Sequence, residues 1–178
     1  MSEQTQPQLP GRLGNPELRL RDDPRADPRM LKAMDELGLL DEAPPLPVSA
    51  SSRVDELLAF CAMAEEGYEA LNNTVTSTWP PLTGVTRETQ VIKGIDDNEI
   101  TLYIHRPEKV QDTLPGILHI HGGGMVLMSA AGSMYDRWRS ELAATGLVVV
   151  GVEFRNGAGK LGPHPFPAGL NDCSAALH

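Results

Sequence analysis

The chain has 178 residues, of which 40% are hydrophobic, 22% charged and only 4% aromatic, a composition typical of a globular protein with a lean core. Its net charge of -9, with no run of Lys and Arg, makes nucleic acid and anionic membranes unfavourable partners. Because Cys61 and Cys173 form no disulfide framework and the polar N-terminus lacks the apolar segment of a secretory signal, we expect a cytoplasmic protein.

The first part of the chain is predicted to be a flexible segment followed by a short helix. Residues 1–26 are rich in Pro, Gln, Arg and Asp and lack hydrophobic periodicity. Asp27 and Pro28 then form a typical helix start, an N-cap followed by a proline in the first turn. Gly38 is suited to end that helix.

A second, longer helix is predicted over residues 53–71. Apolar residues recur there at a spacing of about 3.6 residues, which gives the helix one apolar face. Ser52 and Asp55 have the spacing of a capping box at its start. We expect the apolar face mainly to pack against the core, with the alternative that it helps to wall a substrate pocket.

Two β-rich segments, residues 85–94 and 100–105, flank a polar turn and predict an antiparallel hairpin. Ile100, Leu102 and Ile104 fall on one face of the second strand. Such alternation predicts a strand that buries one face and exposes the other.

The most informative stretch is a short apolar segment that ends in His121 and three glycines, Gly122, Gly123 and Gly124. The apolar segment, with no helical spacing, predicts a buried strand. Consecutive glycines let the backbone turn sharply and direct several N–H groups toward one point. Such an arrangement stabilises a developing negative charge, which is the task of an oxyanion hole.

Beyond the glycines the sequence predicts a helix, a strand and a further helix. Ser133, as the cap, and Asp136 predict the start of a helix that continues to Ala144. Residues 147–154 are almost continuously apolar, which is typical of a strand buried on both faces of a parallel sheet. Together these segments predict a βαβ unit. The last ten residues have helical spacing, and the chain is expected to stop within that helix.

Three motifs in series resemble the hormone-sensitive-lipase-like branch of the α/β-hydrolase fold. They are His121-Gly-Gly-Gly124, Val152-Glu-Phe-Arg155 and His164-Pro-Phe-Pro-Ala-Gly-Leu-Asn-Asp-Cys173. The resemblance implies a truncated α/β-hydrolase fold, the first four strands of a mostly parallel sheet with an N-terminal helical cap region. The expected parts are a flexible lead-in (1–26), the helical cap region (27–80) and the N-terminal half of the hydrolase core (81–178).

The resemblance also implies a function, the hydrolysis of short to medium acyl esters by a serine carboxylesterase or lipase-like hydrolase. Gly123 and Gly124 match the family's oxyanion donors, and His121 and Gly122 match residues that shape the glycine loop. The family nucleophile lies in a Gly-x-Ser-x-Gly motif, which occurs nowhere in these 178 residues. The nucleophile, acid and base of the triad are therefore expected outside this chain, which would be inactive alone and need a complementary C-terminal half.

Two other interpretations remain open: a non-catalytic ligand-binding protein on the same scaffold, and a degenerate fragment without a function of its own. The sequence contains no phosphate-binding loop, Rossmann fingerprint or CxxC pair, so no cofactor is predicted. His119 and His121 are a weak zinc signal, and no metal site is predicted. The other histidines are expected to have surface or structural roles, and the two cysteines to be inert buried thiols: His105, His164, His178, Cys61 and Cys173.

The family topology also carries an expectation about stability. Its sheet order begins 1-2-4-3-5, so a sheet that ends with strand 4 would leave the apolar glycine strand at an edge. Exposed apolar edges favour pairing with another chain. We therefore expect the chain alone to be poorly soluble or partly molten.

Overall fold

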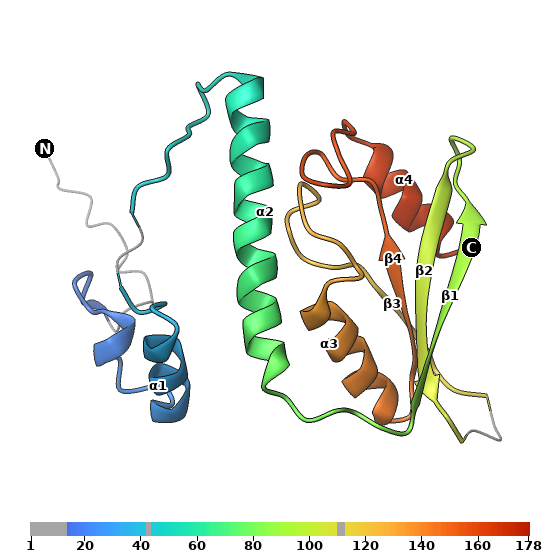
Figure 1. Ribbon diagram of the computed structural model, residues 1–178, viewed down its shortest axis with the longest axis horizontal. Coiled ribbons are helices and arrows are strands. Elements are labelled where there is room, and N and C mark those ends of the chain that lie inside the picture. Colours follow the sequence, from blue (N-terminus) through green and yellow to red (C-terminus); the bar gives the residue numbers. More distant parts are fainter. Residues whose placement is uncertain (1–13, 42–43, 110–112) are drawn as a thin grey trace, which may run out of the picture. The chain divides into compact units, whose positions relative to one another are not determined.

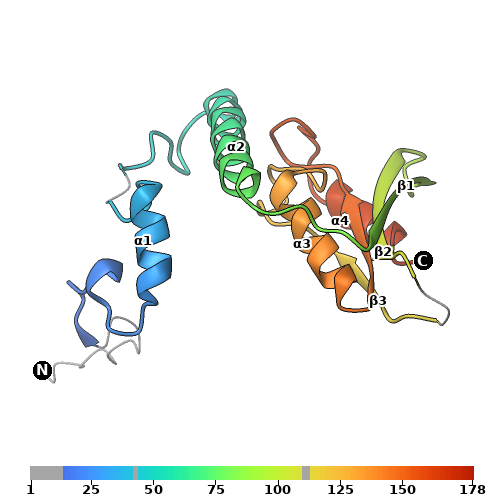
Figure 2. The same cartoon turned by 60° about the horizontal axis from the view of Figure 1, so that its bottom comes forward.

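The computed structural model describes residues 14–41, 44–109 and 113–178. They belong to two compact units, residues 1–46 and residues 47–178, which we describe separately. Figure 1 shows the elements in sequence colours, and Figure 2 shows the same cartoon turned by 60°. Of the predicted flexible lead-in, residues 1–13 lie outside the described residues.

The first unit contains the 3₁₀ helix η2 (Leu20–Asp22) and the helix α1 (Pro28–Glu36). The side chain of Asp27 caps α1 by accepting a hydrogen bond from the Arg29 N–H at 2.8 Å. Gly38 follows the helix with a φ of +68°, a conformation that glycine adopts without strain. The helix start and stop predicted from the sequence are both confirmed.

The second unit begins with α2 (Val54–Ser77), which runs six residues beyond its predicted end. The predicted capping box is wrong by one residue. The Arg53 N–H donates to the Glu56 side chain at 3.0 Å, whereas the hydroxyl of Ser52 accepts from the Ser49 N–H. Within α2, which is described throughout, the only buried residue is Glu65, so the predicted apolar face is at most partly covered.

The sheet has the order β1-β2-β4-β3, formed by β1 (Val85–Lys93), β2 (Glu99–Pro107), β3 (Gly116–His119) and β4 (Val148–Glu153). β1 and β2 form the predicted antiparallel hairpin, and β2 also pairs antiparallel with β4. β3 and β4 are parallel and are joined through α3 (Ser133–Ala144), which confirms the βαβ unit. The family order 1-2-4-3 is therefore present.

Helices cover both faces of this sheet, as both views show (Figures 1 and 2). On one face, Ile100 and Val152 form the main core with Cys173 of α4 (Ala168–Ala175). On the other, Val149 packs against Ala143 of α3. The predicted exposed face of β2 is therefore wrong, because α3 covers its side chains and leaves His105 only 1% exposed.

The last helix, α4, ends at Ala175, so the expectation that the chain stops within a helix is wrong. The N–H of Ala176 closes the final turn by donating to the carbonyl of Asp172 at 3.1 Å. Across the described ranges, no helix is long and apolar enough to cross a membrane.

Candidate active site

The glycine loop leaves the end of β3 in a conformation that requires glycine. Gly123 and Gly124 have φ angles of +114° and +65°, where side chains cause strain. A Cβ atom on Gly123 would lie only 2.0 Å from the carbonyl oxygen of Leu127. That contact arises because the Gly123 carbonyl accepts the N–H groups of Val126 and Leu127, at 3.1 and 3.3 Å, and folds the loop back on itself.

The N–H groups of Gly123 and Gly124 donate to no acceptor within the described part of the chain. Both glycines line a hollow of about 490 Å³. Its other walls come from α2, from α3 and from the loop itself: Tyr68, Asn72, Leu127, Met128 and Tyr135. Two unpaired N–H donors beside a hollow are available to bind an oxygen atom that carries negative charge.

His121 is buried and is not among the residues that line the hollow. Its ring stacks on Phe154, with 4.2 Å between centroids and an interplanar angle of 11°. Burial lowers the pKa of His121, which favours the neutral ring at pH 7. Because Nδ1 lies 2.7 Å from the carbonyl oxygen of Gly122, this nitrogen carries the hydrogen and donates to that oxygen.

A second loop, residues 155–163, holds the glycine loop in place. The N–H groups of Gly157 and Ala158 donate to the carbonyls of Met125 and Val126, at 2.9 and 2.8 Å. Asn156, completely buried, donates from Nδ2 to the carbonyl of Met128 at 2.6 Å. Among these residues two non-glycine positions have positive φ angles: Met125 (58°) and Met128 (81°). Such strain persists only where surrounding contacts fix the backbone.

Two acidic side chains, for which the sequence predicted no role, anchor the glycine loop. Glu153, at the end of β4, accepts hydrogen bonds from the Ser129 hydroxyl at 2.7 Å and the Ala130 N–H at 2.8 Å. Glu65, in the middle of α2, accepts the Met128 N–H at 2.7 Å. An acid that ends an otherwise apolar strand could have drawn attention to Glu153. Glu65, among other acidic residues on a helix, gave no such signal.

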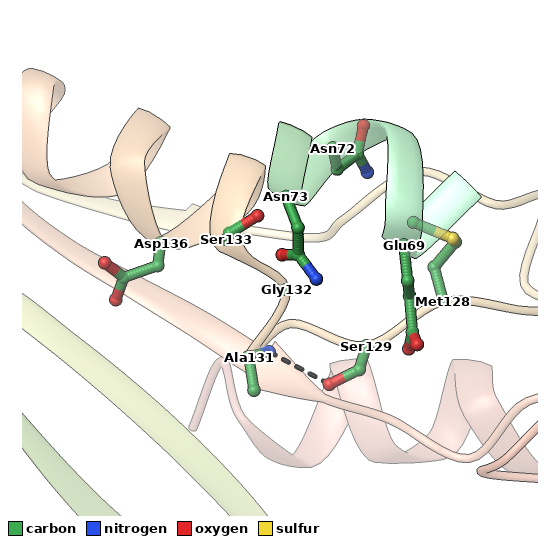
Figure 3. Close-up of a pocket in the computed structure, with 9 residues that line it drawn as sticks. All are labelled: Glu69, Asn72, Asn73, Met128, Ser129, Ala131, Gly132, Ser133 and Asp136. Atoms are coloured by element: carbon green, nitrogen blue, oxygen red, sulfur yellow. Dashed lines mark hydrogen bonds between the residues drawn. The ribbon is translucent and has the colours of Figure 1, made fainter. Parts of the chain in front are cut away.

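A more polar hollow, also of about 490 Å³, continues between α2 and α3 and shares Asn72 and Met128 with the glycine hollow. Figure 3 shows Asn73 from α2 and Ser133 from α3 on its walls. Ser133 is the first residue of α3, and Gly132 occupies the cap position, so the predicted capping role of Ser133 is wrong. Its hydroxyl is buried and has no hydrogen-bond partner in the described residues.

One cluster in this unit has the composition of a catalytic triad but a different chemistry. Ser140 is completely buried, and its hydroxyl lies 3.0 Å from Nδ1 of His105. Nε2 of His105 accepts the Arg139 Nε–H at 3.1 Å, so Nδ1 carries the hydrogen and cannot remove the proton of the serine. Burial, with the charge of Arg139, lowers the pKa of His105 to about 4. The cluster is structural, as expected for His105.

The remaining predicted residues are placed as follows. His119, at the end of β3, has a half-buried ring 5.9 Å from that of Tyr135, and burial lowers its pKa. No group of three or more side chains able to hold a metal ion occurs in the ranges that the structure describes. Cys173 is buried, which raises the pKa of its thiol, whereas Cys61 is only partly buried.

Comparisons with known proteins bear on the fold and the family of this chain. The family described as BD-FAE matches residues 102–178. The structure of brefeldin A esterase, a bacterial homologue of human hormone-sensitive lipase, superposes with a TM-score of 0.84 and 40% sequence identity over 95% of this chain. The chain is similar in sequence and fold to the N-terminal portion of a hormone-sensitive-lipase-like α/β-hydrolase. The family and fold class predicted from the three motifs are confirmed.

Two further matches show how much of its relatives' length this chain covers. Esterase Est22 superposes with a TM-score of 0.71 and 27% identity over 89% of this chain. A tuliposide A-converting enzyme of Tulipa gesneriana is 37% identical over 67 residues, which are 36% of this chain and 17% of that enzyme. The chain covers 47% of both brefeldin A esterase and Est22, so it spans about half the length of these esterases.

Proposed function

We propose that this chain supplies the oxyanion-binding half of a serine carboxylesterase that hydrolyses short to medium acyl esters. The backbone N–H groups of Gly123 and Gly124 bind the carbonyl oxygen of the ester as it gains negative charge. His121 and Gly122 shape the loop that presents these donors. One observation supports this proposal most directly. The N–H groups of Gly123 and Gly124 are unpaired within the described chain, and both glycines border a hollow of about 490 Å³.

The proposal assigns the nucleophile to a complementary C-terminal half. No Gly-x-Ser-x-Gly occurs in the chain, and two of the serines in this unit already have other partners. Ser129 donates to Glu153, and Ser140 is buried against His105. We therefore infer that the chain alone is inactive. A reducing compartment such as the cytoplasm suits its two free cysteines.

The first test assays the 178-residue chain with p-nitrophenyl butyrate. We expect no turnover above the uncatalysed rate and no labelling by a serine-directed fluorophosphonate. Joining the chain to the C-terminal half of brefeldin A esterase, which carries the missing part of the fold, is expected to give both turnover and labelling. Labelling without the join would disprove the absence of a nucleophile.

The oxyanion role is tested by Gly123→Ala in the joined protein. The added Cβ, 2.0 Å from the Leu127 carbonyl oxygen, displaces the loop, so kcat should fall about a hundredfold to a thousandfold, as for the loss of one oxyanion donor. The control is Gly116→Ala in β3, where the nearest atom is 4.0 Å away. If the joined protein is labelled and Gly123→Ala keeps its kcat, the glycines are not the donors.

A further inference from the structure

Glu65 is the only buried residue of α2, and the structure gives its carboxylate two partners from different loops. One carboxylate oxygen, Oε1, accepts the Met128 N–H at 2.7 Å. The other, Oε2, accepts the Lys160 N–H at 2.7 Å. The side chain is 0% exposed, so both bonds are protected from water. A buried carboxylate needs such donors, and bonds to a charged acceptor are stronger than those to a neutral one.

The first of these bonds leads directly to the glycine loop. Met128 has a φ of +81°, a conformation that a non-glycine residue keeps only under constraint. Its Cγ atom would lie 3.1 Å from a Cβ on Gly123, so the Met128 side chain packs against that glycine. The bond from Glu65 therefore fixes a strained residue that borders the same hollow as Gly123 and Gly124.

The second hydrogen bond, from the Lys160 N–H, connects Glu65 to the loop of residues 155–163, which holds the glycine loop in place. Gly159, with a φ of +67°, passes so close that a Cβ there would lie 2.5 Å from Oε2 of Glu65. One turn along α2, Glu69 forms an ion pair with the side chain of Lys160. Two acids of one helix thus hold the same loop residue, and this fixes the position of α2 along the loop.

We infer that Glu65 is a positioning residue that sets the geometry of the glycine loop from helix α2. It touches neither substrate nor reacting atoms, and it acts through Met128 on one loop and through Lys160 on the other. The functional part of this inference rests on the proposed oxyanion role of Gly123 and Gly124. The structural part, that one carboxylate orders both loops, stands by itself and can be measured without catalysis.

The test uses Glu65→Gln in the 178-residue chain. A glutamine offers one oxygen and one NH₂ group, so one of the two loop N–H groups would face a donor and lose its partner. We expect hydrogen exchange over residues 123–131 and 156–161 to become about tenfold faster or more, with exchange in the β1–β2 hairpin unchanged. The amide resonances of Gly123 and Gly124 are expected to shift in NMR spectra.

The control is Glu66→Gln, which removes the same charge from an exposed neighbour on the same helix. It should leave the exchange of both loops and the two glycine resonances unchanged. Unchanged exchange in Glu65→Gln, or equal acceleration in every element, would overturn the positioning role. Neither result depends on turnover. A failure of the positioning role is therefore distinct from a failure of the proposed oxyanion role, which is tested by the kcat of the joined protein.

A second variant tests the same contact from its other side and does not alter Glu65. In Gly159→Ala the new Cβ displaces the carboxylate, and exchange should rise in residues 123–131, which are distant from position 159 in sequence. Gly84→Ala is the control, because Gly84 has a similar φ of +78° but no atom within 4 Å of its Cβ position. If the two alanine variants leave residues 123–131 equally protected, Glu65 does not order the glycine loop.

Discussion

At the scale of single residues, the cluster around His105 illustrates how hydrogen-bond direction decides chemistry. The Ser140 hydroxyl lies 3.0 Å from Nδ1 of His105, and a carboxylate oxygen of Asp136 lies 3.5 Å from Nε2. Arg139, however, donates a hydrogen bond to that same Nε2. The imidazole is therefore held as a neutral donor toward Ser140, the opposite of what a catalytic base requires. Because His105 is buried in its neutral form, its contribution to the stability of the fold depends on pH.

We predict that the free energy of unfolding falls as the pH drops below about 6.5. The folded pKa of His105 is lowered from 6.5 to about 4, so between these values the unfolded chain binds a proton that the folded one does not. Stability from this group is fully present above pH 6.5 and is lost toward pH 4. Urea unfolding at pH 7 and pH 5 should differ by about 2 kcal/mol from His105 alone.

His105→Gln is the control for this dependence. Burial also lowers the pKa of His119 and His121, so part of the pH effect should remain in this variant. The difference between pH 7 and pH 5 should nevertheless shrink by most of the contribution of His105. An identical pH dependence in the variant and the original chain would contradict the assignment.

The sequence predicted some of these residue roles and could not predict others. Gly123 was identifiable, because three glycines after an apolar strand indicate a sharp turn with exposed N–H groups. Glu65 was not, because its burial depends on N–H groups of Met128 and Lys160, 63 and 95 residues further along the chain. A helix with several acidic residues gives no local sign of which one is buried.

At the scale of elements, Asp172 joins three parts of the core that are distant in sequence. Its buried carboxylate accepts hydrogen bonds from the backbone and guanidinium of Arg155, just after β4, and from Asn98 in the β1–β2 turn. Burial by itself would raise the pKa of Asp172, but these hydrogen bonds hold that pKa below its ordinary value. Asp96 of the same turn also pairs with Arg155. Helix α4 is thereby fixed to the hairpin and to β4.

Asp172→Ala is predicted to cost about 2–4 kcal/mol of unfolding free energy, because the backbone N–H of Arg155 and the side-chain amide of Asn98 lose their acceptor and Arg155 keeps, among the described residues, only Asp96 as a carboxylate partner. Urea unfolding at low protein concentration measures this loss. The matched control is Glu88→Ala, which removes an ion pair with Arg106 in which both side chains are about half exposed. This loss should cost at most about 1 kcal/mol. Equal losses in the two variants would show that the three-element junction has no special role.

The order of the elements was accessible from the sequence, whereas some of their limits were not. Apolar alternation and the glycine positions predicted the hairpin, the βαβ unit and α4. The last six residues of α2 were missed, since its polar end lacks an apolar stripe. There, Thr74 and Thr76 donate from their hydroxyls to the carbonyls of Ala70 and Asn72, both at 2.8 Å, which satisfies these groups inside the helix.

At the scale of the whole molecule, the two edges of the sheet differ in character. β1 carries charged residues along its length, among them Arg87, Glu88 and Lys93, which discourage pairing with another strand. β3 has no charged residue, and in the described chain it pairs on one side only, with β4. Ile117 in this strand is 38% exposed. The apolar edge predicted from the family topology is therefore present at β3.

We predict that the purified 178-residue chain associates with itself through the β3 edge. A strand with unpaired backbone groups and apolar side chains can pair with the same strand of a second copy. Sedimentation over a range of concentrations should show reversible association that Ile117→Lys weakens at least about tenfold, because a lysine at an edge opposes such pairing. Val91→Lys, a control on the edge strand β1, should change little, since Val91 is 54% exposed and lies on the charged edge. A chain that stays monomeric and unfolds in one sharp thermal transition would show that the β3 edge needs no partner.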